Sequence, residues 1–309
     1  EGIALREAGI KIPILVLVPE NDVSVEASVD YDLDYAVERF EVVKAISSYA
    51  KQKGKTAKVH IYIDTGMGRN GISAERSIEL VGKCFNLENI NPIGIMSHFA
   101  SSESDREYTS LQLQRFLNLV ESLKANGFEF EMHHIANTGA LFSLPESYLD
   151  TVRPGLALYG YVHNQTLAPF EFKPVMEIFS KVISLRRLKP GESVGYGRKF
   201  IATKETTIAT VPIGYGDGLF KSSEEALYCL IGGKRKKVVG GICMDEIMVD
   251  VGDDDIKVGD EVVILGSQGE EKITGKDLAS FSKTIVYEVI TSFSNRIPKV
   301  YIENGSKTV

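Results

Sequence analysis

The chain has 309 residues, of which 43% are hydrophobic and 25% are charged, and its formal net charge is −7. A chain of this size can bury the core of one large or two medium domains. The negative charge argues against the basic faces by which proteins bind nucleic acid or anionic membranes. No run reaches the roughly 20 apolar residues of a membrane helix, and the first residues lack the pattern of a signal peptide.

The three cysteines, Cys84, Cys229 and Cys243, lie far apart and form no Cys-x-x-Cys pair. The sequence therefore predicts neither a disulfide framework nor a zinc site. This cysteine usage fits a reducing compartment, so we expect a cytoplasmic protein without a bound metal ion.

The first part of the chain alternates between strand and helix patterns. Residues 1–9 have helical spacing of apolar residues and end at Gly9, so we expect the interior of a helix that begins before Glu1. Strands are expected at residues 14–18, 35–37, 58–64, 92–98, 129–135 and 156–159. Helices are expected at residues 41–52, 74–85 and 108–125, with a short one from Gly139.

Strands that alternate with helices predict an α/β protein with a parallel sheet. A (β/α)8 barrel of the TIM type needs eight strands, whereas about six are recognisable here, and an open sheet would expose its edges. We therefore predict an incomplete barrel in residues 1–168, with two more strands expected before Glu1.

Residues 169–309 have a different pattern, typical of a separate, mostly antiparallel β-domain. Strands are expected at residues 175–188, 206–212, 226–231, 238–243, 247–251 and 261–265, with one helix near 275–281. The dense basic run Lys234–Lys237 is interpreted as a solvated hairpin loop.

Three predicted strands end in polar residues. The strand at 156–159 follows Arg153 and the turn residue Gly155, the strand at 58–64 leads into a glycine-rich turn with Arg69, and the strand at 129–135 leads to Thr138. Taken singly, Arg153 is interpreted as a surface ion-pair partner and Thr138 as a helix N-cap. Taken together, the three strand ends predict one shared site for an anion.

Seven motifs, in this order, resemble those of the bacterial alanine racemases. They are Asp64-Thr-Gly-Met-Gly-Arg69, Ser97-His-Phe-Ala100, His134-Ile-Ala-Asn-Thr138, Val152-Arg-Pro-Gly155, Val211-Pro-Ile-Gly-Tyr-Gly-Asp-Gly218, Ile242-Cys-Met-Asp245 and Tyr287-Glu288. The resemblance covers essentially the whole chain, and the order of the seven motifs makes the resemblance specific.

The resemblance implies an enzyme that uses pyridoxal 5'-phosphate (PLP) to interconvert L- and D-alanine through an external aldimine and two opposed bases. It implies that the product D-alanine serves peptidoglycan synthesis, and that the enzyme is a homodimer whose active site is shared between subunits. One base is a Schiff-base lysine, expected before Glu1, and the other is Tyr196.

The resemblance also implies which residues bind the cofactor. The Thr138 hydroxyl, the amides of Gly155 and Leu156, and the Tyr287 hydroxyl are expected to bind the phosphate. Arg153 is expected to face the pyridine nitrogen. A guanidinium there donates a hydrogen bond without giving up its proton, so the ring stays unprotonated.

His98 is expected to support Arg153, although a lone histidine at a strand end is as readily explained as a structural residue. Arg69 is expected to contact the cofactor's phenolic oxygen and the substrate carboxylate, and the Met244 backbone to bind that carboxylate. Tyr215 and Asp245, together with Tyr287, are expected to line the entrance.

The sequence departs from the family pattern at three positions. Tyr62 stands where many relatives carry a carbamylated lysine that neutralises the arginine corresponding to Arg69, so Asp64 or an anion is considered as a substitute. Relatives often carry arginines where this chain has Lys221 and Gly241, which predicts a wider entrance.

Two alternatives are kept. The first is a racemase that acts on serine or a broader range of amino acids. The second is a non-catalytic PLP-binding or dimerisation fragment, because no lysine of this chain lies at the position of the family's Schiff-base lysine.

Overall fold

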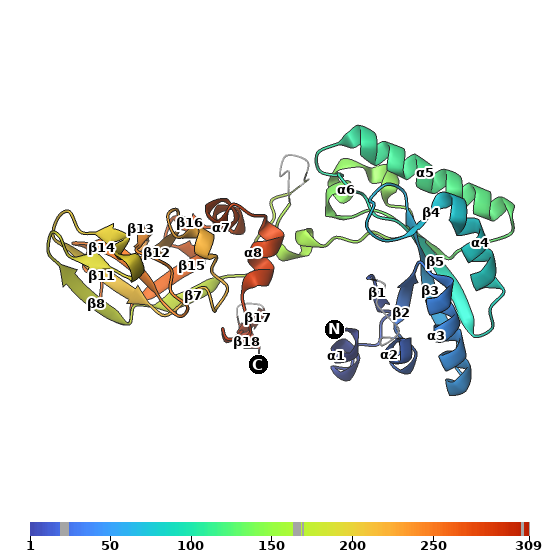
Figure 1. Cartoon of the computed structure of the whole chain (residues 1–309), viewed down its shortest axis with the longest axis horizontal. Helices are drawn as coiled ribbons and strands as arrows, with labels where there is room; N and C mark the ends of the chain where they lie inside the picture. The colour runs from blue at the N-terminus through green and yellow to red at the C-terminus, as the bar shows by residue number, and fades with distance from the viewer. Residues whose placement is uncertain (19–24, 163–167, 169, 304–305, 309) are drawn as a thin grey trace. The chain divides into compact units, whose positions relative to one another are not determined.

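The computed structural model describes residues 1–18, 25–162, 168, 170–303 and 306–308 (Figure 1). The chain divides into two compact units. One, here called the barrel unit, comprises Glu1–Leu158 and Val162–Phe172, and the other, here called the β-unit, comprises Tyr159–Tyr161 and Lys173–Val309.

The barrel unit is built on a parallel sheet in which helices follow strands. Its path runs through β1 (Leu15–Val16), β2 (Asp34–Val37), β3 (Ala57–Asp64), β5 (Ile90–Met96) and β6 (Met132–His134), with β4 (Ile72–Ser73) paired to β3. Its helices are α1 (Gly2–Glu7), α2 (Val25–Asp30), α3 (Phe40–Lys53), α4 (Ala74–Phe85), α5 (Arg106–Ala125) and α6 (Thr138–Ser143). The predicted parallel β/α architecture is confirmed, with the sheet forming half a barrel.

The two faces of this sheet carry different side chains. Because neighbouring residues of a strand point to opposite faces, Val59, Ile61 and Ile63 of β3 join the core beneath α3, α4 and α5 (Figure 1). His60 and Tyr62 point to the other, inward face, where Tyr62 packs with other apolar residues. Polar residues of the inward face are therefore backed by the hydrophobic core on the other side of the sheet.

One predicted strand of this unit is wrong. Residues Leu156–Tyr159 form a 3-10 helix, η3, instead of a buried strand. The Leu158 amide donates to the Gly155 carbonyl at 3.1 Å, which closes a helical turn directly after the predicted turn residue. Leu158 is 69% exposed, so the apolar run does not mark burial on two sides.

The β-unit contains an eight-stranded sheet whose strand pairs are all antiparallel, as predicted. Its order is β16-β15-β12-β13-β14-β11-β8, with β7 paired to β15. The strands are β7 (Ile178–Lys181), β8 (Ser184–Leu188), β11 (Thr206–Val211), β12 (Tyr228–Ile231), β13 (Lys234–Val239), β14 (Ile247–Gly252), β15 (Glu261–Gln268) and β16 (Glu271–Ile273).

Smaller elements complete the β-unit. Two short hairpins pair β9 (Ser193–Val194) with β10 (Phe200–Ile201), and β17 (Tyr301–Glu303) with β18 (Ser306–Thr308). The helices are α7 (Gly275–Ser282) and α8 (Val286–Ser292), with 3-10 turns η5 (Tyr196–Arg198) and η6 (Lys221–Ser223). The sequence predicted α7 but not α8.

Two predictions for this unit are wrong. The strand expected at 175–188 is two strands with different partners, since the Val182 amide bonds to Asp260 and the next amide, of Ile183, bonds to Thr210. The basic run Lys234–Lys237 lies in strand β13 rather than in a loop. The hairpin turn falls earlier, at two glycines, and Lys236 pairs with Asp254 at 2.5 Å.

Candidate active site

Arg153 is held at the carboxyl end of the barrel unit's sheet by four acceptors. One terminal nitrogen of its guanidinium lies 2.5 Å from Nδ1 of His134. The other donates to the Ser97 carbonyl at 2.6 Å and the Ile135 carbonyl at 3.3 Å, and lies 3.4 Å from Nδ1 of His98. The interpretation of Arg153 as a surface ion-pair partner is therefore wrong, and its predicted contact with His98 is present.

The partners of Arg153 are neutral groups. Burial, with the nearby charge of Arg153, lowers the pKa of His98 to about 4 and that of His134 to about 2. Both imidazoles are therefore uncharged near neutral pH and can accept hydrogen bonds. Burial also lowers the pKa of Arg153 to about 10, which still leaves it protonated.

Two N–H groups of Arg153 remain for a ligand. A guanidinium has five N–H groups, and the Nε–H and one N–H of the terminal nitrogen that bonds to His134 donate to no group in the part of the chain that the structure describes. The orientation of the guanidinium is fixed by the bonds of the two terminal nitrogens. An Nε–H held in this orientation suits an acceptor atom, and the pyridine nitrogen of PLP is one.

Thr138 contacts the start of η3, the turn that follows Arg153 in sequence. The Thr138 side chain, 4% exposed, receives a bond from the Ala157 amide at 3.4 Å. A Cβ on Gly155 would reach only the Thr138 hydroxyl, at 4.0 Å. The first amides of a helical turn have no acceptor within it, so a hydroxyl and backbone donors converge here, as a phosphate requires.

The N-cap interpretation of Thr138 is wrong. The N-cap of α6 is Asn137, whose side-chain oxygen accepts from the Ala140 amide at 3.1 Å. Asn137 also receives a bond from the Ser102 hydroxyl at 2.6 Å. The capping role is thus filled by the neighbouring residue, and the Thr138 hydroxyl is left to the turn at Gly155.

The turn that carries Arg69 is built around Asp64. Its Oδ1 accepts from the amides of Gly66 at 2.9 Å, Met67 at 2.8 Å and Gly68 at 3.2 Å. Arg69 is exposed and makes no hydrogen bond or ion pair with the described residues. The carboxylate of Asp64 is therefore engaged by the turn rather than by Arg69.

Tyr196 lies on an exposed turn of the β-unit. Its side chain is 82% exposed, and glycines with positive φ flank it. Two contacts tie this turn down: Arg198 donates from Nε to the Ser193 hydroxyl at 2.9 Å, and Lys199 forms an ion pair with Glu224. The backbone is therefore fixed while the phenol stays accessible.

The predicted entrance residues lie on adjoining loops. The Tyr215 amide donates to the Cys243 carbonyl at 3.0 Å, and the Gly216 amide donates to the Met244 carbonyl at 2.9 Å. These bonds bring Tyr215, Met244 and Asp245 together. Tyr287, on α8, is 43% exposed.

Sequence reasoning missed Arg296. It forms ion pairs with Asp245 and, at 3.6 Å, with Asp217, so it joins the two entrance loops. The signal was present, because both predicted motifs contain a carboxylate that needs a cation. No pattern pointed to a lone arginine 51 residues beyond Asp245.

A parallel half-barrel that gathers a buried guanidinium, a hydroxyl and backbone donors at its strand ends has the arrangement of a β/α-barrel enzyme, in which the active site lies at the carboxyl ends of the strands. Comparison with known proteins then gives the family. The model of the alanine racemase N-terminal domain matches residues 1–163, and that of the alanine racemase C-terminal domain matches residues 175–301.

Relatives and solved structures agree with these matches. The alanine racemases of Clostridium novyi and Clostridium tetani are 40% and 38% identical, over 99% of this chain and 80% and 81% of their own lengths. The structure of alanine racemase from Clostridium difficile 630 aligns with a TM-score of 0.95 at 36% identity, over 100% of this chain and 81% of that one. The structure of alanine racemase from Bacillus anthracis with bound L-Ala-P aligns with a TM-score of 0.93 at 30% identity, over 99% of this chain and 80% of that one.

The chain belongs to the alanine racemase family. It is a PLP-dependent isomerase that interconverts L- and D-alanine, the family's route to D-alanine. Within the described residues, no helix is both long and apolar enough to span a bilayer.

Proposed function

We propose that Arg153, Thr138, Gly155 and Leu156 hold PLP, with Arg153 donating from Nε to the pyridine nitrogen. When bound, PLP supplies an electron sink that makes the Cα proton of alanine removable. The observation that carries this proposal is the buried guanidinium of Arg153, which is fixed by four acceptors while its Nε–H stays unused by the described residues. His98 supports the orientation of Arg153.

The Thr138 hydroxyl and the Gly155 and Leu156 amides bind the phosphate, with the Tyr287 hydroxyl as a further donor. Backbone dipoles and hydroxyls suit a phosphate because they stabilise charge without a competing side-chain titration. The convergence of Thr138 on the turn at Gly155 supports this assignment.

Removing the Thr138 hydroxyl tests the phosphate site. Thr138→Val keeps the shape of the side chain but loses one hydrogen bond to a charged group, worth about 1.5–3 kcal/mol. We expect PLP to bind about 10- to 100-fold more weakly, measured by fluorescence titration of the apoprotein. Thr138→Ser, which keeps the hydroxyl, is the matched control, and equal affinity of the valine and serine variants would contradict the role.

Two bases on opposite faces of Cα carry out the proton exchange. Tyr196 removes the proton of the L-enantiomer, and the second base, the family's Schiff-base lysine, removes that of the D-enantiomer. Arg69 and the Met244 backbone bind the substrate carboxylate, and Tyr215 and Asp245 line the entrance. The 82% exposure of Tyr196 within its unit supports a role toward another surface.

We further propose that the protein is a homodimer in which Tyr196 acts in the site of the partner's barrel unit. Arg69 and Tyr196 then belong to different subunits at each site. The location is proposed to be cytoplasmic, since Cys84, Cys229 and Cys243 are all unpaired thiols.

Mixing two inactive variants tests the shared site. Arg69→Ala and Tyr196→Phe should each be nearly inactive, whereas co-refolding them gives mixed dimers with one site that carries neither change. Random pairing predicts about a quarter of the unmodified activity. Activity no higher than that of the separate variants would place both residues of each site in one subunit.

A further inference from the structure

A row of four polar side chains crosses the inward face of the barrel unit's sheet and ends at Arg153. Asp34 opens β2, His60 lies in β3, and His134 closes β6. Nε2 of His60 lies 4.0 Å from Oδ2 of Asp34, and Nδ1 of His60 lies 2.9 Å from Nε2 of His134. Nδ1 of His134 lies 2.5 Å from the Arg153 guanidinium.

The sheet is built to admit the His60 ring. His60 is 3% exposed and His134 1% exposed, and their rings meet edge to face at 5.0 Å. Across the register from His60 is Gly94 of β5, and a Cβ there would lie 2.0 Å from Nδ1 of His60. A side chain at position 94 is therefore incompatible with this ring, so the position of His60 requires a glycine at position 94.

The direction of every hydrogen bond in the row follows from Arg153. A guanidinium only donates, so Nδ1 of His134 accepts and carries no proton. The proton of neutral His134 is then on Nε2 and is donated to Nδ1 of His60. His60 must in turn carry its proton on Nε2, which is the nitrogen nearest Asp34.

The far end of the row is the carboxylate of Asp34. Nε2 of His60 is buried without a hydrogen-bond partner among the described residues, and 4.0 Å is too long for a hydrogen bond to Asp34. The N–H dipole of His60 therefore faces a carboxylate in a poorly hydrated site, where electrostatic interactions are strong. The attraction favours the same tautomer that Arg153 imposes from the other end.

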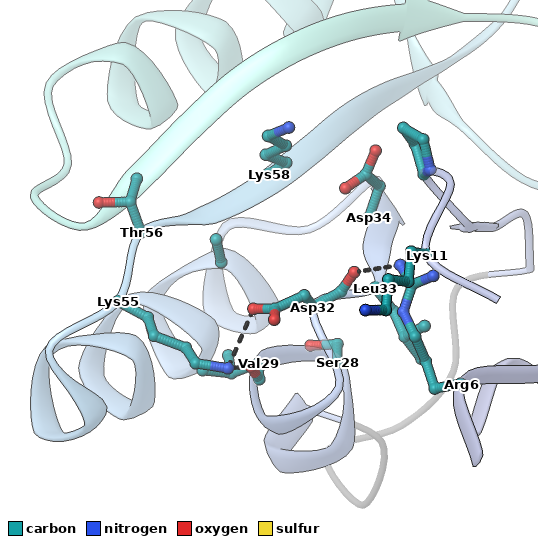
Figure 2. A pocket seen from close by; sticks show the side chains of 12 residues that line it. Arg6, Lys11, Ser28, Val29, Asp32, Leu33, Asp34, Lys55, Thr56 and Lys58 are labelled. Carbon is teal, nitrogen blue, oxygen red and sulfur yellow. Dashed lines mark hydrogen bonds and ion pairs between the residues drawn. The ribbon is translucent and has the colours of Figure 1, made fainter. Parts of the chain in front are cut away.

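Asp34 also opens to a cavity, so the row reaches from the cofactor site to the amino ends of the strands. The cavity, of about 280 Å³, is lined by Asp34 and by Arg6, Lys11, Lys55 and Lys58 among others (Figure 2). Burial raises the pKa of Asp34, while the charges of Lys58 and Arg6 lower it. Cations on the cavity side thus help to keep the carboxylate charged.

We infer that Asp34 and His60 are positioning residues that act through His134 on Arg153, fixing the guanidinium that faces the cofactor ring. The inference rests on the proposed role of Arg153. In this row Arg153 donates to His134, His134 donates to His60, and the Nε2–H of His60 faces the carboxylate of Asp34. A misplaced guanidinium would present Nε–H poorly to its acceptor.

The tautomers of the two histidines test the row without any measurement of activity. In PLP-loaded protein labelled with nitrogen-15 histidine, ring shifts report which nitrogen carries the proton. We expect His60 and His134 to be neutral near neutral pH, with the proton on Nε2 in both. A proton on Nδ1 of either ring, or an imidazolium, would overturn the row. The tautomers can be measured even if the protein racemises no amino acid, so failure of the row can be distinguished from failure of the proposed function.

Variants test the effect on Arg153. His60→Phe should lower kcat about 10- to 100-fold, as expected when a group is displaced by about 1 Å, and should shift the absorption band of bound PLP. Asp34→Asn should change kcat and the PLP absorption band in the same direction by a smaller factor, and should alter the His60 ring shifts. The Asp34→Asn variant also serves as the test if His60→Phe does not fold.

The matched control is His133→Gln, since His133 also pairs with an aspartate, Asp150, at 2.7 Å but lies outside the row. We expect it to leave kcat and the PLP band unchanged. If His60→Phe or Asp34→Asn folded and left both unchanged as well, the row would be merely structural and the inference wrong.

Discussion

Tyr196→Phe should remove most of the proton exchange from L-alanine. General-base catalysis contributes about 10²–10⁴-fold, so kcat/KM for L-alanine should fall within that range. PLP affinity should change little, because the exposed hydroxyl is lost and the ring stays on a turn fixed by Lys199 and Glu224. The measurement is the rate of α-proton exchange from each enantiomer, and a loss below about tenfold from L-alanine would rule out Tyr196 as the base.

The base needs a nearby positive charge, because a tyrosine titrates near 10 in water. Arg198 and Lys199 are adjacent in sequence, but the first is bonded to Ser193 and the second to Glu224. Both therefore hold the turn. This leaves Arg69, which has no ion-pair partner among the described residues, as the cation proposed to favour the phenolate.

Arg153→Lys should have a comparable effect for a different reason. Lysine keeps the charge but lacks the planar fork, so it cannot donate both to the acceptors of the two terminal nitrogens and to the proposed pyridine nitrogen. Loss of a positioned donor typically costs about 10²–10³-fold in kcat. We expect a loss of that size in PLP-saturated protein, measured by steady-state kinetics in both directions.

The same substitution should also lower stability. The buried carbonyls of Ser97 and Ile135 and Nδ1 of His134 compete for fewer donors, and each unsatisfied acceptor costs about 1–3 kcal/mol. The control is Arg187→Lys, at an exposed arginine that pairs with Glu205 and Asp253, where such pairs are worth about 0–1 kcal/mol. Equal melting temperatures for the two variants would contradict the burial argument.

Local patterns predicted most of the barrel unit. Helical periodicity gave α3, α4 and α5 within about two residues, with a glycine stop after α3 and α5. The run at Leu156–Tyr159 misled because an apolar run predicts burial only if another layer covers it, and Leu158 is exposed in its own unit. The prediction of one strand at 175–188 was wrong because the backbone changes its hydrogen-bonded partner strand after Val182, and no local sequence pattern predicts such a change.

The candidate site was predicted to the extent that it lies in contiguous motifs. Arg153 and Gly155 were predicted from one short motif and Thr138 from another, because each motif stands at the end of a predicted strand. The row behind Arg153 was not found, because His60 and His134 are 74 residues apart and only the pairing of parallel strands brings them together. Asp34 likewise meets His60 only through the register of β2 and β3.

The most direct test of the central claim follows the α-proton of alanine in deuterium oxide. Purified, PLP-loaded protein is incubated with L-alanine, L-serine or L-lysine, and the enantiomers and their α-deuterium are measured by chiral chromatography with mass detection. We expect D-alanine that carries α-deuterium to form faster than D-serine or D-lysine, with none from L-alanine when PLP is removed. Faster α-exchange of serine or lysine would contradict the substrate assignment, and D-alanine that retains the protium of L-alanine would contradict proton exchange by two opposed bases.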